Sequence, residues 1–229
     1  MGAAHGPEPA LRSRRFVRIH ALHGIHTSPT SRRLRDMCPY IERGADSPVV
    51  YHEYGDIWAV QTRMKNPGIA RRLAKLIEPG DVLLGHSNGN AIWMRSLLEG
   101  APARGLVILN GALEPDIEFP KPLDFVHAYW NPDDEVVPLT EVPIMRRVFF
   151  DPLWGEMGRT GYTGTDPRVA VNMNCSAFDG MPHLKGHGAI IDPENYDTWG
   201  VEIGRRIATA CLADNTLPGL ALRRNAEAV

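Results

Sequence analysis

A short turn between a strand pattern and a helix pattern constrains this chain more than any other feature of the sequence. Residues 81–85 read DVLLG, an apolar run typical of a buried strand, and residues 90–100 read NAIWMRSLLEG, with apolar residues at helical spacing. Between them lies GHSNG (85–89), which places Ser87 on a sharp strand-to-helix turn. Such a turn presents the serine hydroxyl and points the first amides of the helix toward it. The pattern predicts a nucleophile at Ser87, against the alternative of a turn serine in an inert α/β domain.

Short apolar runs alternate with helical patterns along the rest of the chain. Besides 81–85, the expected strands are 16–22, 47–54, 105–111, 124–130 and 168–174. Besides 90–100, the expected helices are 66–79, with Asn66 as the cap and Pro67 as the first helical residue, and 197–212. This alternation is typical of a parallel sheet with crossover helices. We therefore expect an α/β fold with a mostly parallel sheet of about six strands and helices on both faces.

Composition places the chain among ordinary globular proteins. It has 229 residues, 43% of them hydrophobic and 23% charged, and a formal net charge of -2. This near-neutral charge gives no reason to expect a nucleic acid as partner. No apolar run approaches the ~18 residues needed for a membrane span. We expect one domain at 16–213, with a flexible leader at 1–15 and a frayed tail at 214–229.

The cysteines indicate a reducing compartment. Cys38, Cys175 and Cys211 are widely spaced and form neither a metal-ligand motif nor an even set for disulfides. The N-terminal residues also lack the apolar core of a signal peptide. We therefore expect reduced, buried thiols in a cytoplasmic protein. The sequence indicates no oligomeric state.

Four motifs in order resemble those of the α/β-hydrolase family. They are LHGIHTS (22–28), GHSNG (85–89), NPDDEVVP (131–138) and LKGHGAI (184–190). The resemblance covers most of the chain and implies the order nucleophile, acid, histidine that this fold uses. Few residues precede the first expected strand, so we expect a shortened sheet that begins at the strand before the HG pair. The connection 112–123 is short, so we also expect no large lid.

The resemblance implies a catalytic triad. Ser87 is the expected nucleophile and His187, in a loop flanked by glycines, is the expected base, with His183 as the alternative. The expected acid is Asp134, which lies four residues before the proline of the DEVVP segment, with Asp133 as the alternative. The acid would accept the imidazole Nδ1–H and stabilise the imidazolium.

The same resemblance implies the groups around the triad. The backbone amides of Ile25 and Asn88 are the expected oxyanion donors. Gly24, His26 and His86 are expected to line the substrate site. The long segment 139–167 has no clean period. It is expected to form a wall of the substrate cleft or a subunit contact, against the alternative of an exposed loop with one short helix.

These residues together predict a serine hydrolase that cleaves a carboxylic ester through an acyl-enzyme. The same triad would serve a thioesterase, an amidase or an acyltransferase, and a non-catalytic binding module on this scaffold is the other alternative. The substrate would be a small soluble ester or a bulky acylated partner. His20, His23 and His26 recur at every third position, but no HExxH motif accompanies them. We expect neither a metal nor a cofactor.

Overall fold

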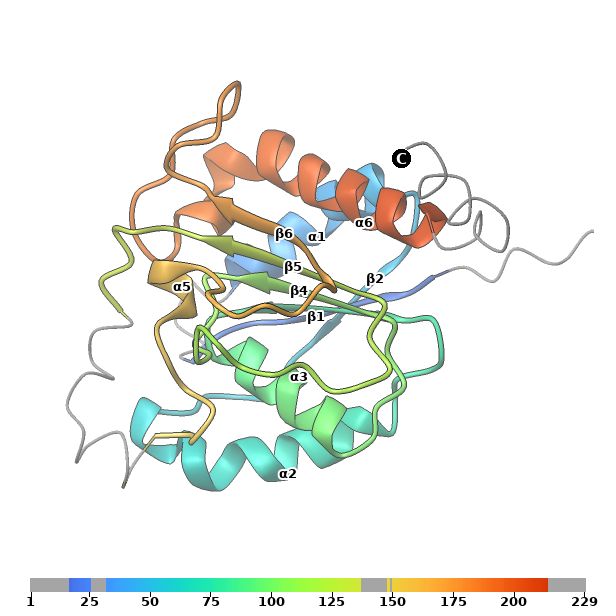
Figure 1. Ribbon diagram of the computed structural model, residues 1–229, viewed down its shortest axis with the longest axis vertical. Coiled ribbons are helices and arrows are strands. Elements are labelled where there is room, and N and C mark those ends of the chain that lie inside the picture. Colours follow the sequence, from blue (N-terminus) through green and yellow to red (C-terminus); the bar gives the residue numbers. More distant parts are fainter. Residues whose placement is uncertain (1–16, 26–31, 137–147, 149, 214–229) are drawn as a thin grey trace, which may run out of the picture.

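A single parallel sheet organises the described part of the protein. The computed structural model describes residues 17–25, 32–136, 148 and 150–213. The sheet has six strands in the order β2-β1-β3-β4-β5-β6, and all five pairings are parallel (Figure 1). The strands are β1 (Ile19–Leu22), β2 (Val49–His52), β3 (Val82–His86), β4 (Gly105–Leu109), β5 (Phe125–Trp130) and β6 (Val169–Asn174). The predicted fold class is confirmed, and each expected strand is found. The expected leader (1–15) and tail (214–229) lie outside the described residues.

Helices cover both faces of the sheet. One face carries α1 (Arg32–Ala45) and α6 (Val201–Ala213), and the other carries α2 (Thr62–Ala74) and α3 (Asn88–Leu98), as Figure 1 shows. A short helix, α5 (Met157–Thr160), lies beside β5. Shorter helical turns are 59–61, 189–191, 193–195 and 196–200. The central strands β1, β3 and β4 are buried along their whole length, which explains why their sequences read as continuous apolar runs.

The helix α1 was not predicted from the sequence. Its buried residues are Leu34, Met37, Cys38, Ile41 and Ala45, which recur at helical spacing on one face. Two features hid this pattern: arginines dominate the first turn, and Pro39 lies inside the helix. Packing of the apolar face against α6 and the sheet outweighs the unfavourable proline.

The predicted start of the second helix was wrong. The helix α2 begins at Thr62, so Asn66 is not its cap and Pro67 lies in its second turn. Asn66 is fully buried and uses its side-chain amide in tertiary hydrogen bonds, which a capping residue at the surface could not make. The helix also ends at Ala74, before the predicted stop at Pro79.

The strand order places a crevice between β1 and β3. From β1 the chain crosses outward to β2, whereas from β3 it crosses in the opposite direction to β4. The loops that leave β1 and β3 therefore diverge, and ligands of open parallel sheets bind outside the carboxyl ends of strands at such a point. These two loops carry His23–Gly24 and Ser87, respectively. The connection 112–123 contains no helix or strand, as expected for a chain without a large lid there.

Two helices on one face meet through glycines. A Cβ atom added to Gly204 of α6 would overlap the Ile41 carbonyl oxygen and lie 2.7 Å from the Ala45 amide nitrogen of α1. We predict that Gly204→Ala lowers the free energy of unfolding by about 1–3 kcal/mol, since the two helices must move apart. The matched control is Gly68→Ala in α2, where a Cβ meets nothing within 4 Å.

Gly68→Ala should raise the free energy of unfolding by about 0.5–1 kcal/mol, because alanine is the better helix former. Urea unfolding of both variants measures the two effects. Equal stability of the two variants would contradict the close helix contact.

Candidate active site

Ser87 occupies a strained turn between β3 and α3. Its backbone has φ 54° and ψ -124°, a conformation that costs energy for any residue other than glycine. Hydrogen bonds from outside the turn hold it: the Ser87 amide donates to the Leu109 carbonyl (3.1 Å), and its carbonyl accepts from the Ala112 amide (3.2 Å). The residue is 4% exposed. The turn therefore has the geometry that a nucleophile elbow requires.

The loop after β1 packs directly on this serine. A Cβ added to Gly24 would lie 2.8 Å from Ser87 Cβ, 3.2 Å from Ser87 Oγ and 3.5 Å from His86 Nδ1. Only glycine allows the loop to approach so closely. The Tyr54 hydroxyl donates to the His23 carbonyl (3.0 Å) and to the Gly24 carbonyl, which fixes the loop from the other side.

A buried aspartate and a partly buried histidine form a hydrogen-bonded pair at the same edge of the sheet. His187 Nδ1 donates to Asp134 Oδ2 at 2.7 Å. The Asp134 side chain has no exposed surface, and it also accepts hydrogen bonds from the Val136 amide and from Asn110 Nδ2. With the proton on Nδ1, His187 Nε2 is the basic nitrogen. The His187 side chain is 14% exposed.

The two sequence alternatives lie elsewhere. Asp133 is exposed, and its backbone amide donates to Asn131 Oδ1 within the turn. His183 is also exposed. The structure therefore brings Asp134 and His187 together, and it leaves the neighbouring aspartate and histidine at the surface.

His86 connects the histidine loop to the elbow. Its Nε2 donates to the His187 carbonyl at 3.1 Å, and the two rings lie 4.9 Å apart. Because His86 directly precedes Ser87, this bond holds the loop of His187 over the elbow. Among the described residues no hydrogen bond joins Ser87 Oγ to His187.

The two backbone amides expected as oxyanion donors lie at the start of α3 and directly after Gly24. Asn88 is the first residue of α3, where a backbone N–H has no acceptor within the helix. Ile25 is half-buried and packs against the apolar cluster under α2 and α3. His26, the third expected substrate-binding residue, lies outside the described residues.

Several residues of the site were not predicted from the sequence. Asn110 follows β4 with φ 42° and donates to Asp134, and a Cβ added to Gly158 would lie 2.8 Å from Asp134 Oδ2. The Asn-Gly pair at 110–111 is a turn signal that could have drawn attention to the first of these. Part of the segment 139–167 is also buried: Phe150, Trp154 and others pack against α2 and α3, so this part is not an exposed loop.

Within the described residues no group of three His, Cys, Asp or Glu side chains is placed to hold a metal ion. His20 bonds instead to His52 Nε2 (2.8 Å) and Asp81 (3.0 Å), while His23 stacks on Tyr54. No helix in the described ranges is long and apolar enough to cross a membrane.

Comparison with known proteins gives matches of structure alone. No protein-family model matches the chain, and no curated protein matches it. Similar solved structures include the esterase domain of a Rhodothermus marinus protein, with 9% identity over 87% of this chain and 88% of that chain and a TM-score of 0.48. Another is TT1662 from Thermus thermophilus, with 17% identity over 87% and 88% and a TM-score of 0.43.

A third is an extracellular alpha/beta-hydrolase from a Paenibacillus species, with 10% identity over 86% of this chain and 98% of that chain and a TM-score of 0.42. At these identities and TM-scores, no property of these proteins transfers to this chain. The parallel sheet and the strand–GHSNG–helix turn are those of the α/β-hydrolase fold, as the sequence motifs predicted.

Burial of His86 should make stability depend on pH. Burial lowers the pKa of His86 from 6.5 to about 3, and the nearby His187 adds to this effect. A histidine with a lowered pKa binds fewer protons in the folded state than in the unfolded state. The contribution of neutral His86 to the free energy of unfolding is therefore complete above about pH 6.5 and is lost as the pH falls toward 3. We predict that the free energy of unfolding falls by roughly 1 kcal/mol per pH unit in this window because of His86.

The measurement is urea unfolding between pH 7 and 5 for the wild type and His86→Gln. The variant should lose less stability over this range. An identical pH dependence of the two proteins would contradict a neutral, buried His86.

Proposed function

We propose that this protein is a cofactor-independent serine hydrolase that cleaves a carboxylic ester through an acyl-enzyme on Ser87. The observation that carries the proposal is the partly buried Asp134–His187 hydrogen bond of 2.7 Å, which lies at the same sheet edge as the strained turn of Ser87. His86 joins the two, because it precedes the serine and bonds to the His187 backbone. A serine hydroxyl needs such a base before it can act as a nucleophile.

The proposed reaction has two halves. His187 Nε2 takes the proton of Ser87 Oγ as the oxygen attacks the ester carbonyl, and Asp134 stabilises the imidazolium that forms. The tetrahedral oxyanion is held by the backbone amides of Asn88 and Ile25. Collapse expels the alcohol, which receives its proton from His187. Water then attacks the acyl-enzyme with the same base, and the acid is released.

Gly24 and His86 contribute to the substrate site of this proposal in different ways. Gly24 lies against Ser87 and leaves room at the hydroxyl for the reacting carbonyl. His86 is kept neutral by burial, so it would add no charge beside the developing oxyanion. The proposed substrate is a small soluble ester or an acylated partner that presents its acyl group at the edge of the sheet.

We also propose that the protein is cytoplasmic, and its three cysteines are consistent with this location. Cys38, Cys175 and Cys211 are buried, and none of them forms a disulfide within the described part of the chain. Burial raises the pKa of Cys38 and of Cys175 to about 12, so neither is a reactive thiolate.

We predict that a fluorophosphonate probe labels the wild type at Ser87. His187→Ala should abolish labelling, because the serine loses its base, whereas His183→Ala should label as the wild type does. Mass-spectrometric mapping of the adduct identifies the residue. A folded wild type that takes no label would overturn the proposal and favour a non-catalytic binding module.

A second prediction concerns the acid. Asp134→Asn should lower kcat for p-nitrophenyl acetate by about 10³–10⁴-fold, because the histidine loses the partner that fixes its tautomer. Asp133→Asn, next to it in sequence and exposed, should keep kcat within about twofold of the wild type. A similar loss in both variants would contradict the assignment of the acid.

A further inference from the structure

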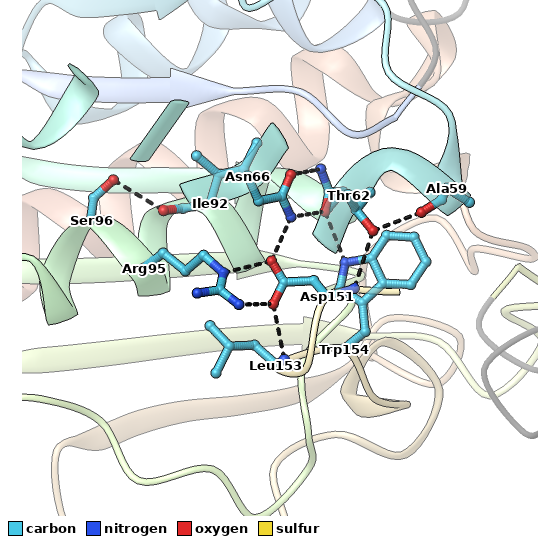
Figure 2. Close-up of polar contacts among 10 residues, drawn as sticks. Ala59, Thr62, Asn66, Ile92, Arg95, Ser96, Asp151, Leu153 and Trp154 are labelled. Atoms are coloured by element: carbon cyan, nitrogen blue, oxygen red, sulfur yellow. Dashed lines mark hydrogen bonds and ion pairs between the residues drawn. The ribbon is translucent and has the colours of Figure 1, made fainter. Parts of the chain in front are cut away.

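A chain of buried hydrogen bonds ends on the side chain of Asn88, the residue after the proposed nucleophile. Asp151 lies between Arg95 and Asn66, as Figure 2 shows. Its two carboxylate oxygens accept from Arg95 Nε and Nη2, both at 2.7 Å, and one of them also accepts from Asn66 Nδ2 at 2.8 Å. Asn66 Nδ2 donates in turn to Asn88 Oδ1 at 2.8 Å, and Trp154 Nε1 donates to the same oxygen at 2.8 Å.

The groups at the two ends of the network determine which atom donates and which accepts in each of its hydrogen bonds. Asp151 is an acceptor only, so the amide of Asn66 must turn its NH₂ group toward it. The indole of Trp154 is a donor only, so the amide of Asn88 must turn its oxygen toward that ring. The reverse bond from Asn88 Nδ2 to Asn66 Oδ1 (3.2 Å) fits the same orientations. The Asn88 side chain therefore has a single arrangement.

Burying the polar and charged groups of this network costs desolvation free energy, and their hydrogen bonds and ion pair offset that cost. Asp151 has no exposed side-chain surface, and Arg95 supplies the compensating charge through two parallel bonds. Asn66 and Asn88 are likewise fully buried. A buried polar group without a partner would be strongly destabilising, so each member depends on the others.

Asn88 also connects to the loop on the other side of the serine. Burial raises the pKa of Tyr54, and a side-chain hydrogen bond with Asn88 opposes that rise. The phenol therefore keeps its proton, and it donates this proton to the carbonyls of His23 and Gly24. Tyr54 therefore links the side chain of Asn88 to the loop of His23 and Gly24.

We propose that the Asn66–Asn88–Trp154 cluster, anchored by the Arg95–Asp151 ion pair, positions the backbone amide of Asn88 toward the oxyanion of the transition state. This inference rests on the proposed function of Ser87. Asn66, Trp154 and Asp151 act in it as positioning residues, since they reach the reacting atoms only through Asn88. A backbone amide contributes most when it is fixed before charge develops, and rotation about the bonds of residue 88 would misalign it.

The test compares two variants with a matched control. Trp154→Phe keeps an aromatic ring and removes the indole N–H that donates to Asn88 Oδ1, whereas Asn66→Ala removes the reciprocal pair of amide bonds. The control is Ser96→Ala, which removes the buried hydrogen bonds of the Ser96 hydroxyl to the Ile92 carbonyl of α3 and the Ala70 carbonyl of α2, neither of which involves Asn88. Figure 2 shows the bond to Ile92. The readouts are kcat and KM for p-nitrophenyl acetate, and inhibition by a trifluoromethyl ketone and by its unfluorinated methyl ketone.

Trp154→Phe and Asn66→Ala should each lower kcat about tenfold with KM within about twofold, since loss of a whole oxyanion donor costs about 10²–10³-fold. The trifluoromethyl ketone adds to the serine as an oxyanion, so its affinity should fall in parallel, while that of the methyl ketone stays constant. The midpoint of the pH–rate profile should not move, because the Asp134–His187 pair is untouched. Ser96→Ala should keep wild-type kcat.

Two results would overturn the inference in different ways. If the wild type takes a fluorophosphonate label on Ser87 but both variants keep its kcat and its affinity for the trifluoromethyl ketone, the positioning role is wrong and the proposed function stands. The positioning role is also wrong if Ser96→Ala loses as much kcat as the two variants. If the wild type takes no label at Ser87, the proposed function fails and this inference fails with it.

Discussion

The left-handed backbone at Ser87 is the constraint on which the rest of the site depends. A serine with φ 54° is stable only when its surroundings hold it there. The backbone of β4 and of the turn after it binds the amide and the carbonyl of the residue, while Gly24 packs on its side chain. The turn thus exists because three strands, β1, β3 and β4, end at one level of the sheet, which their parallel register ensures.

The two faces of the sheet supply different parts of the proposed chemistry. Residues around His187, such as Leu184 and Ile190, belong to the apolar cluster under α1 and α6. Trp154 belongs to the cluster under α2 and α3, and it holds Asn88. In this account, proton transfer is supported from one face and the oxyanion from the other, and the elbow at Ser87 is where they meet.

The strands and the turn at Ser87 could be predicted from the sequence, because each has a local signal. Asp134 and His187 were proposed only from the resemblance of their segments to family motifs, with Asp133 and His183 left as alternatives, and the structure shows which two residues meet. Apolar runs mark buried strands, and glycines two residues on either side of Ser87 mark the turn. The helix α1 was missed because its signal, the apolar face of Leu34 to Ala45, is offset by arginines and Pro39. Asn66 was misread as a cap because local chemistry favours that role, whereas its partners, Asn88 and Asp151, are distant in sequence. Long-range polar pairs leave no local pattern, so the network around Asn88 could come only from the structure.

The most direct test of this account is to trap the covalent intermediate. The wild-type protein is mixed with p-nitrophenyl acetate, quenched in acid during turnover, and its intact mass and peptides are measured. We predict a single acetyl group on Ser87, present during turnover and absent once the substrate is exhausted. Hydrolysis of the ester without an acetyl group on Ser87, in a protein quenched at the same times, would contradict it.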